Sequence, residues 1–166
     1  RLRCDWSSDV CSSDLIVTAF GTPHTPFLPE QVSNAPGQLK PEAMMNEVRE
    51  HLEKAKPDVI IVFTSDHFVN FFYNHFPAFC VGVIDEAETT PETGCNMPHY
   101  SLQGHKRMAA ALHRAALKSN FDLATAQEVK LEHTIMVPLH FITLNMNIPI
   151  IPIYNGGLAQ IGRAHV

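Results

Sequence analysis

The sequence has few cysteines, one tryptophan and no long run of apolar residues. Its four cysteines form no CxxC pair, so the sequence offers no disulfide framework and fits a reducing compartment. No apolar run approaches the roughly 20 residues that a membrane span needs, and no secretory signal is visible. The net charge of −5 gives no basic footprint for nucleic acid. We therefore expect a cytoplasmic globular domain that binds neither nucleic acid nor a membrane.

Several common catalytic signatures are also missing. The sequence contains no HExxH motif, which marks many zinc proteases, and no GxSxG motif or P-loop. The pair Gly156-Gly157 is too short a signal to predict a phosphate-binding loop. Any chemistry must therefore come from side chains brought together by the fold.

The two ends of the sequence are related to each other in an unusual way. Residues 9–14 and 161–166 are codon-compatible reverse complements at six consecutive positions, as a translated sequencing-library adapter would be. We predict that residues 1–15 are such an artefact and are disordered, that residues 160–166 are also an artefact, and that residues 16–159 are the native part, the N-terminal portion of a catalytic domain. A genuine Ser-rich tail is the alternative for the first segment.

Hydrophobic patterning predicts strands that alternate with helices. The predicted strands are residues 15–20, 59–65, 78–84, 121–130 and 148–154. The predicted helices are residues 41–56, residues 101–119 and a segment opened by Pro138. Residues 27–39 and 85–98 are predicted loops, and the acidic side chains of the second loop are expected to be solvated. This alternation indicates an α/β fold with a layered, mostly parallel sheet flanked by helices and incomplete at the C-terminus.

The stretch around which the chain is organised is the predicted strand 59–65. It opens with five consecutive apolar residues, four of them β-branched, which is typical of a strand covered on both faces. Asp66 and His67 follow directly. Since ligand sites in open α/β sheets lie beyond the carboxyl ends of strands, these two residues are candidates for a metal or substrate site.

Two further histidines follow predicted strands. His24 lies between Pro23 and Pro26, which stiffen its loop, and His133 follows Glu132. Taken alone, His24 could simply cap a turn, but parallel strands would bring His24, His67 and His133 to one side of the sheet. Two histidines with one carboxylate suit Fe(II), whereas three histidines suit a catalytic zinc. The spacing does not choose between these metals.

Four segments resemble the class III extradiol ring-cleavage dioxygenases. They are Pro23-His24-Thr25-Pro26, residues 66–73, residues 77–83, and Glu132-His133 together with Pro138-Leu139. The likeness covers essentially all of residues 16–159 in the same order, and the stretch Asp-His-x-x-x-Phe-Phe-Tyr within residues 66–73 is its most specific part.

The resemblance implies Fe(II)-dependent cleavage of a catechol-type ring by O₂, at a bond beside the two hydroxyls. It implies that His24 and His67 are iron ligands and that His133 is an acid/base that handles a catechol proton. The carboxylate ligand and a further active-site histidine are expected beyond this chain, which is therefore expected to be inactive alone. The full-length protein is expected to be a homo-oligomer.

The neighbours of these histidines are expected to support them. The resemblance places the carboxylate ligand elsewhere, so Glu132 is predicted to orient the His133 imidazole and Asp66 to support the site, rather than to bind iron. Phe68, Asn70 and Phe71 are predicted to contact a flat apolar substrate, with ordinary core packing as the alternative. The sequence has Glu132-His133-Thr134 where the family usually has Asp-His-Gly, which leaves the particular catechol open.

Two other functions remain open at this point. One is a zinc-dependent hydrolase on a similar scaffold that uses the same three histidines, and the other is a non-enzymatic member of the same superfamily. Activity that depends on zinc rather than iron would favour the hydrolase over a dioxygenase. A different residue at the position of the carboxylate ligand in the intact protein would favour the non-enzymatic member.

Overall fold

The computed structural model describes residues 16–92 and 94–156, so the predicted artefact segments lie outside the described residues. The elements, in order, are α1 (Leu28–Asn34), α2 (Lys40–Ala55), β1 (Ile60–Ser65), β2 (Phe79–Gly82), β3 (Glu86–Glu88), β4 (Ser101–Gln103), α3 (Lys106–Lys118), β5 (Ala124–Ala126), α4 (His133–Ile142) and β6 (Ile150–Asn155). Among these helices, none is both long and apolar enough to pass through a membrane.

Four of the strands form one sheet in the order β1-β6-β2-β5. The pairs β1–β6 and β2–β5 are parallel, with Ile60 opposite Ile150 in the first, and the pair β2–β6 is antiparallel. Strands β3 and β4 form a separate antiparallel pair. The prediction of an α/β fold with a mostly parallel sheet is confirmed, as are the predicted elements that correspond to α2, β1, β2 and β6.

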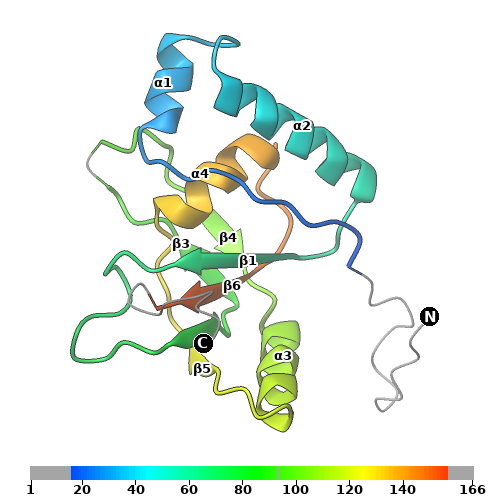
Figure 1. The fold of residues 1–166 in the computed structure, drawn as a ribbon, viewed down its shortest axis with the longest axis vertical. Helices are drawn as coiled ribbons and strands as arrows, with labels where there is room; N and C mark the ends of the chain where they lie inside the picture. The colour runs from blue at the N-terminus through cyan, green and yellow to red at the C-terminus, as the bar shows by residue number, and fades with distance from the viewer. Residues whose placement is uncertain (1–15, 93, 157–166) are drawn as a thin grey trace, which may run out of the picture.

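Helices cover both faces of the sheet and make a layered fold (Figure 1). Helix α4 packs on one face and α2 packs on α4, whereas α3 packs on β2 and β6 from the other side. The larger core cluster, which includes Met45, Ile135 and Tyr154, lies on the α4 side. A smaller cluster around Val81 and Ile153 lies under α3.

Strand β6 is covered on both faces, but β1 is not. Every residue of β6 from Ile150 to Tyr154 is buried, but on β1 the Phe63 side chain is 76% exposed. The reason is position, because β1 is at the edge of the sheet, whereas α3 packs on β2 and β6. The expectation that residues 59–65 are covered on both faces was therefore wrong, since an apolar run does not specify which strand becomes central.

Three further predictions about secondary structure were also wrong: one strand, one loop and the start of one helix. Residues 16–20 form no strand, and Ile16 is 87% exposed. Helix α1 forms where residues 27–39 were predicted to be a loop, because Pro29 sits in its first turn, where a missing N–H costs nothing. Helix α3 begins at Lys106, with His105 as its N-cap, and Ser101–Gln103 form strand β4 instead of its first turns.

The last helix begins earlier than predicted, which changes the setting of His133. Helix α4 starts at His133 with Glu132 in an extended conformation as its N-cap, and Pro138 lies inside the helix rather than at its start. The preceding strand β5 covers only three residues and ends well before Glu132. His133 therefore sits in the first turn of a helix, where its direction is fixed by the helix axis.

Candidate metal centre

Three histidines from distant parts of the chain face one another. His24 lies in the irregular segment before α1, His67 follows the end of β1, and His133 opens α4. The ring centroids are 6.0 Å apart for His24 and His67, 6.1 Å for His24 and His133, and 5.0 Å for His67 and His133. The structure thus brings together the three imidazoles that the sequence singled out, although only His67 directly follows a strand.

Asp66 shapes the loop that carries His67. Its side chain is 1% exposed, and it accepts hydrogen bonds from the backbone N–H of Asn70 at 3.0 Å and of Phe71 at 3.0 Å. The Asn70 amide also donates to Asp66 at 2.8 Å and to the Lys130 carbonyl at 3.0 Å. Asp66 therefore holds Asn70 and Phe71 in the loop after His67, and Asn70 in turn ties this loop to the segment that leads into α4.

Glu132 contacts His67 at two points. Its Oε1 accepts a hydrogen bond from the His67 backbone N–H at 2.8 Å, and its Oε2 lies 3.4 Å from His67 Nδ1. The same Oε2 lies 3.8 Å from His133 Nδ1. A carboxylate beside Nδ1 is the arrangement that orients a metal-binding histidine and leaves Nε2 free for the metal.

The Glu132 carboxyl is held in an unfavourable environment for its charge. The residue is 1% exposed, and its Oε2 has no hydrogen-bond partner among the described residues. Burial raises the pKa of this carboxyl to about 7, the hydrogen bond from the His67 N–H acts in the opposite direction, and repulsion from Asp66 adds to the rise. A cation placed among the histidines would favour the ionised form, since it would compensate for the lost solvation.

His24 is held in the form that binds metals. Its side chain remains open to solvent on one side, yet partial burial lowers the pKa of its imidazole, and the neighbouring His133 and His67 lower it further. A lowered pKa keeps the ring neutral, and only a neutral imidazole has a lone pair for a metal ion.

Glu92 is a functional candidate that the sequence did not reveal. Its Oε1 accepts a hydrogen bond from the His133 backbone N–H at 2.6 Å, and its Oε2 lies 2.5 Å from His133 Nδ1. Its side chain is 23% exposed, so the expectation that the acidic side chains of residues 85–98 are solvated was wrong for Glu92. No spacing or motif marks this residue, because its contact depends on how the loop folds back onto α4.

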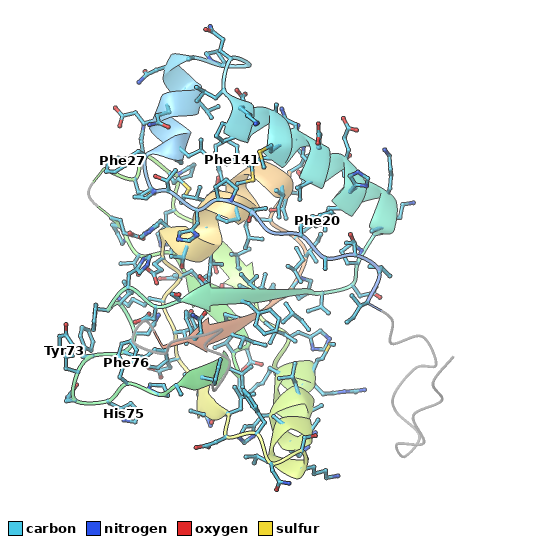
Figure 2. All side chains as sticks on the ribbon, viewed as in Figure 1. Phe20, Phe27, Tyr73, His75, Phe76 and Phe141 are labelled. Atoms are coloured by element: carbon cyan, nitrogen blue, oxygen red, sulfur yellow. The ribbon has the colours of Figure 1, made fainter. Side chains whose placement is uncertain are left out.

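The three residues predicted to contact substrate lie in different settings. Phe71 is 8% exposed and packs edge-on against Tyr154, and the Asn70 side chain is occupied by Asp66 and Lys130. Phe68 is 38% exposed and packs against Tyr73 and Phe76. Figure 2 shows Tyr73 and Phe76 on the loop that projects beyond the end of the sheet. Contact of these residues with a substrate stays a prediction.

Two overlapping sets of side chains could hold a cation here. His24 and His67 are the pair implied by the sequence resemblance. Ligand atoms of His67, Glu132 and His133 also lie within 4.8 Å of one another, close enough to share one ion. A cavity of about 90 Å³ borders Glu92, Glu132 and His133 on the side of the 89–99 loop, so there is space beside His133.

Comparison with known proteins identifies the family. Residues 18–160 match the model of the catalytic LigB subunit of aromatic ring-opening dioxygenase. The chain belongs to this LigB family. The resemblance to the class III extradiol dioxygenases is thereby confirmed.

Curated relatives of this LigB-family chain share its sequence at modest identity. A 2,3-dihydroxyphenylpropionate/2,3-dihydroxicinnamic acid 1,2-dioxygenase from Pseudomonas putida is 27% identical over 132 residues, which are 79% of this chain and 41% of the relative. Enzymes of the same name from Paraburkholderia phymatum and Klebsiella pneumoniae are 29% and 27% identical, over 71% and 82% of this chain and 36% and 42% of the relative. The chain thus spans about two fifths of the length of these relatives.

Proposed function

We propose that this chain forms part of an Fe(II)-dependent extradiol dioxygenase that opens a catechol-type ring and incorporates both atoms of O₂ into the product. The observation that carries the proposal is the cluster of His24, His67 and His133, whose ring centroids are 5.0–6.1 Å apart. Family membership and relatives named as ring-cleaving dioxygenases support it.

The residues present fit an iron ion. Imidazoles suit Fe(II), and the buried Glu132 carboxylate, with an oxygen that has no hydrogen-bond partner among residues 16–92 and 94–156, would be stabilised by a nearby cation. We assign His24 and His67 as ligands and Glu132 as the group that orients His67 through Nδ1. When bound, iron would hold the catechol oxygens and O₂ next to each other.

His133 is proposed to handle the proton of a catechol hydroxyl. Its ring is stacked beside that of His67 at 5.0 Å, so a substrate bound next to His67 would lie within its reach. Imidazole accepts and releases protons near neutral pH, as general acid–base catalysis requires. Asp66 supports the site indirectly, because its hydrogen bonds to the backbone of Asn70 and Phe71 fix the loop after His67.

The aromatic loop after His67 is proposed to form one side of the substrate site. Phe68 offers a half-exposed ring close to His67 in the chain, backed by Tyr73 and Phe76. Asn70 and Phe71 would act less directly, because their side chains are engaged with Asp66 and Tyr154. A flat apolar ring suits such a wall.

Metal titration of the chain tests the ligand assignment. We expect the chain to bind Fe(II) or its spectroscopic substitute Co(II) under anaerobic conditions, and His24→Ala and His67→Ala each to weaken this binding strongly. His75→Ala is the matched control, because His75 is exposed on the loop between β1 and β2 and lies outside the cluster. Equal affinity in all three variants would contradict the assignment.

Activity measurements then separate the possible functions. We expect catechol turnover, followed as absorbance of the ring-opened semialdehyde, in a chain extended to the length of its relatives, and loss of turnover on iron chelation. Zinc-dependent hydrolysis that survives iron chelation would favour a hydrolase. Robust catechol turnover by the 166-residue chain alone would show that the carboxylate ligand is already present, with Glu132 as the candidate.

A further inference from the structure

The contacts of Glu92 with His133 repeat those of Glu132 with His67. In each pair, one carboxylate oxygen accepts from the backbone N–H of the histidine and the other faces its ring Nδ1. Both carboxylates come from residues far from their histidine in the chain, 65 residues away for Glu132 and 41 for Glu92. The repetition suggests that each acid has the same task, which is to fix the direction and the proton position of one imidazole.

We propose that Glu92 is a positioning residue for His133, which holds the ring in the tautomer with the proton on Nδ1 and so leaves the lone pair of Nε2 for the substrate. This inference rests on the proposed function for the role of His133 as a base. Nothing in the sequence pattern assigned Glu92 any role, and its contact with His133 is the shorter of the two carboxylate–imidazole contacts, at 2.5 Å against 3.4 Å.

The chemistry of a carboxylate determines the tautomer. An ionised carboxylate only accepts hydrogen bonds, so a ring nitrogen at 2.5 Å from it must carry the proton. In a neutral imidazole the other nitrogen then has the lone pair. Within the described residues, Nε2 of His133 has no hydrogen-bond partner, so it is the nitrogen that remains available.

The backbone holds Glu92 in place for this task. The Thr90 N–H donates to the Leu131 carbonyl at 2.8 Å, and Thr89 forms a bridge with Leu131. The Cys95 N–H donates to the Glu92 carbonyl at 3.2 Å. The loop is thus fastened to the residue before Glu132, two positions from His133, and a negative charge at the first turn of α4 is further favoured by the helix dipole.

Glu132 cannot replace Glu92 in this contact. Its Oε2 is 3.8 Å from His133 Nδ1, beyond hydrogen-bond distance, and its Oε1 is already bonded to the His67 N–H. The two carboxylates therefore divide the site between them, one for each histidine.

The tautomer can be measured directly by NMR on the metal-free chain labelled with ¹⁵N at histidine. Long-range proton–nitrogen spectra distinguish a protonated Nδ1 from a protonated Nε2, and the His133 signals are assigned by their absence in His133→Asn. In the unaltered chain we expect the neutral His133 ring to carry its proton on Nδ1, by at least about tenfold over the other tautomer, given the strength of a charge-assisted hydrogen bond. A proton mainly on Nε2 would overturn the proposal without any need for a variant.

Two substitutions sharpen the test. In Glu92→Gln, the amide oxygen can still accept from the His133 backbone N–H, but its NH₂ group then faces the ring and favours an unprotonated Nδ1, so we expect the tautomer to reverse. Glu92→Asp keeps an acceptor-only carboxylate and is expected to restore the Nδ1–H form. The matched control is Glu88→Gln, since the Glu88 side chain is 71% exposed on β3 and lies 3.9 Å from His99.

The outcomes distinguish this inference from the proposed function. If Glu92→Gln keeps the Nδ1–H tautomer, or if Glu88→Gln changes it as much, Glu92 does not position His133. The tautomer is measured without metal and without turnover, so absence of iron-dependent activity would leave the result on Glu92 intact. Conversely, an unchanged tautomer would leave the metal assignment of His24 and His67 standing.

Discussion

Glu132 and Glu92 make the same pair of contacts to a histidine, but they do so in different surroundings. Glu132 is the N-cap of α4, is 1% exposed and lies 3.4 Å from the ring nitrogen of His67. Glu92 lies on the loop after β3, has a side chain that is 23% exposed and approaches the His133 ring to 2.5 Å. In the first pair, Glu132–His67, the carboxylate is buried and the histidine side chain is 46% exposed, whereas in the second pair, Glu92–His133, both side chains are partly buried.

The difference indicates a division of labour between the two pairs. The buried Glu132 carboxylate, with one oxygen unpartnered within the described part of the chain, is costly without metal and becomes favourable beside a cation. The two oxygens of Glu92 contact the backbone N–H and the ring Nδ1 of His133, so this carboxylate needs no cation and serves to orient the His133 ring. We therefore expect changes at the Glu132–His67 pair to alter metal binding and pH-dependent stability. Changes at the Glu92–His133 pair are expected to alter proton transfer.

The largest expected effect is on metal affinity. It comes from removing His67, the histidine of the Glu132–His67 pair, whereas removing His133, the histidine of the Glu92–His133 pair, should have little effect. We expect His67→Ala to lower Co(II) affinity by more than roughly 100-fold, since loss of a ligand exceeds the loss expected for a supporting residue. His133→Ala is expected to leave affinity within a few-fold of the unaltered chain, because we assign it no bond to the metal. Calorimetric titration measures both, and equal losses would show that His133 is a ligand.

Changing the buried carboxylate should weaken metal binding less. Glu132→Gln keeps the size of the side chain but removes the charge behind His67, and we expect affinity to fall about 10–100-fold. The corresponding change at Glu92 should shift affinity by less than about 3-fold, since its partner is His133. Co(II) titration monitored by visible absorption tests both variants, and the reverse order would exchange the roles of the two acids.

The same carboxyl should make the stability of the metal-free chain depend on pH. The pKa of Glu132 is raised from 4.5 to about 7 in the fold, so in this interval the folded chain binds more protons than the unfolded chain. The free energy of unfolding should therefore fall as pH rises from about 4.5 to 7 and remain lowered above it, by roughly 2–4 kcal/mol.

Urea unfolding with a metal chelator at about pH 5 and about pH 8 measures this dependence. In Glu132→Gln this part of the pH dependence should disappear. The free energy of unfolding of the variant, relative to that of the unaltered chain, should therefore be higher at about pH 8 than at about pH 5. Glu88→Gln serves as the control, because its side chain is 71% exposed. If Glu132→Gln and the unaltered chain gave parallel profiles, the Glu132 carboxyl would be ionised at little cost.

The smallest expected effect is on the stability of the loop after His67, which supports the Glu132–His67 pair. Asn70→Ala removes the side-chain bonds to Asp66 and to both the carbonyl and the N–H of Lys130, and should lower the free energy of unfolding by about 1–2 kcal/mol. Asp66 keeps its bonds to the backbone N–H groups of Asn70 and Phe71, which limits the loss. Asn74→Ala, an exposed residue on the same loop, is the control. Identical unfolding curves for the two variants would show that the Asn70 bridge does not stabilise the loop.

Much of the fold could be inferred from local pattern. The helix periodicity of residues 41–56 and the β-branched runs that became β1, β2 and β6 follow from side-chain chemistry that acts within a few residues, and they are present as predicted. Helix α1 was missed because proline was taken as a loop signal, although the first turn of a helix tolerates it. The strand character of residues 16–20 was overestimated because a strand also needs a backbone partner, which apolar composition does not supply.

The sequence by itself determined which residue types are available for chemistry: histidines beside prolines or acids, an aromatic loop, and a net negative chain without nucleic-acid features. Only the tertiary structure decided that β6 rather than β1 is central, since burial depends on which strand the helices cover. It also decided that Glu132 serves His67, 65 residues away, and that Glu92 serves His133. Hydrogen bonds across such separations leave no periodic trace in a sequence, because they are set by the packing of α4 and the 89–99 loop at the end of the sheet.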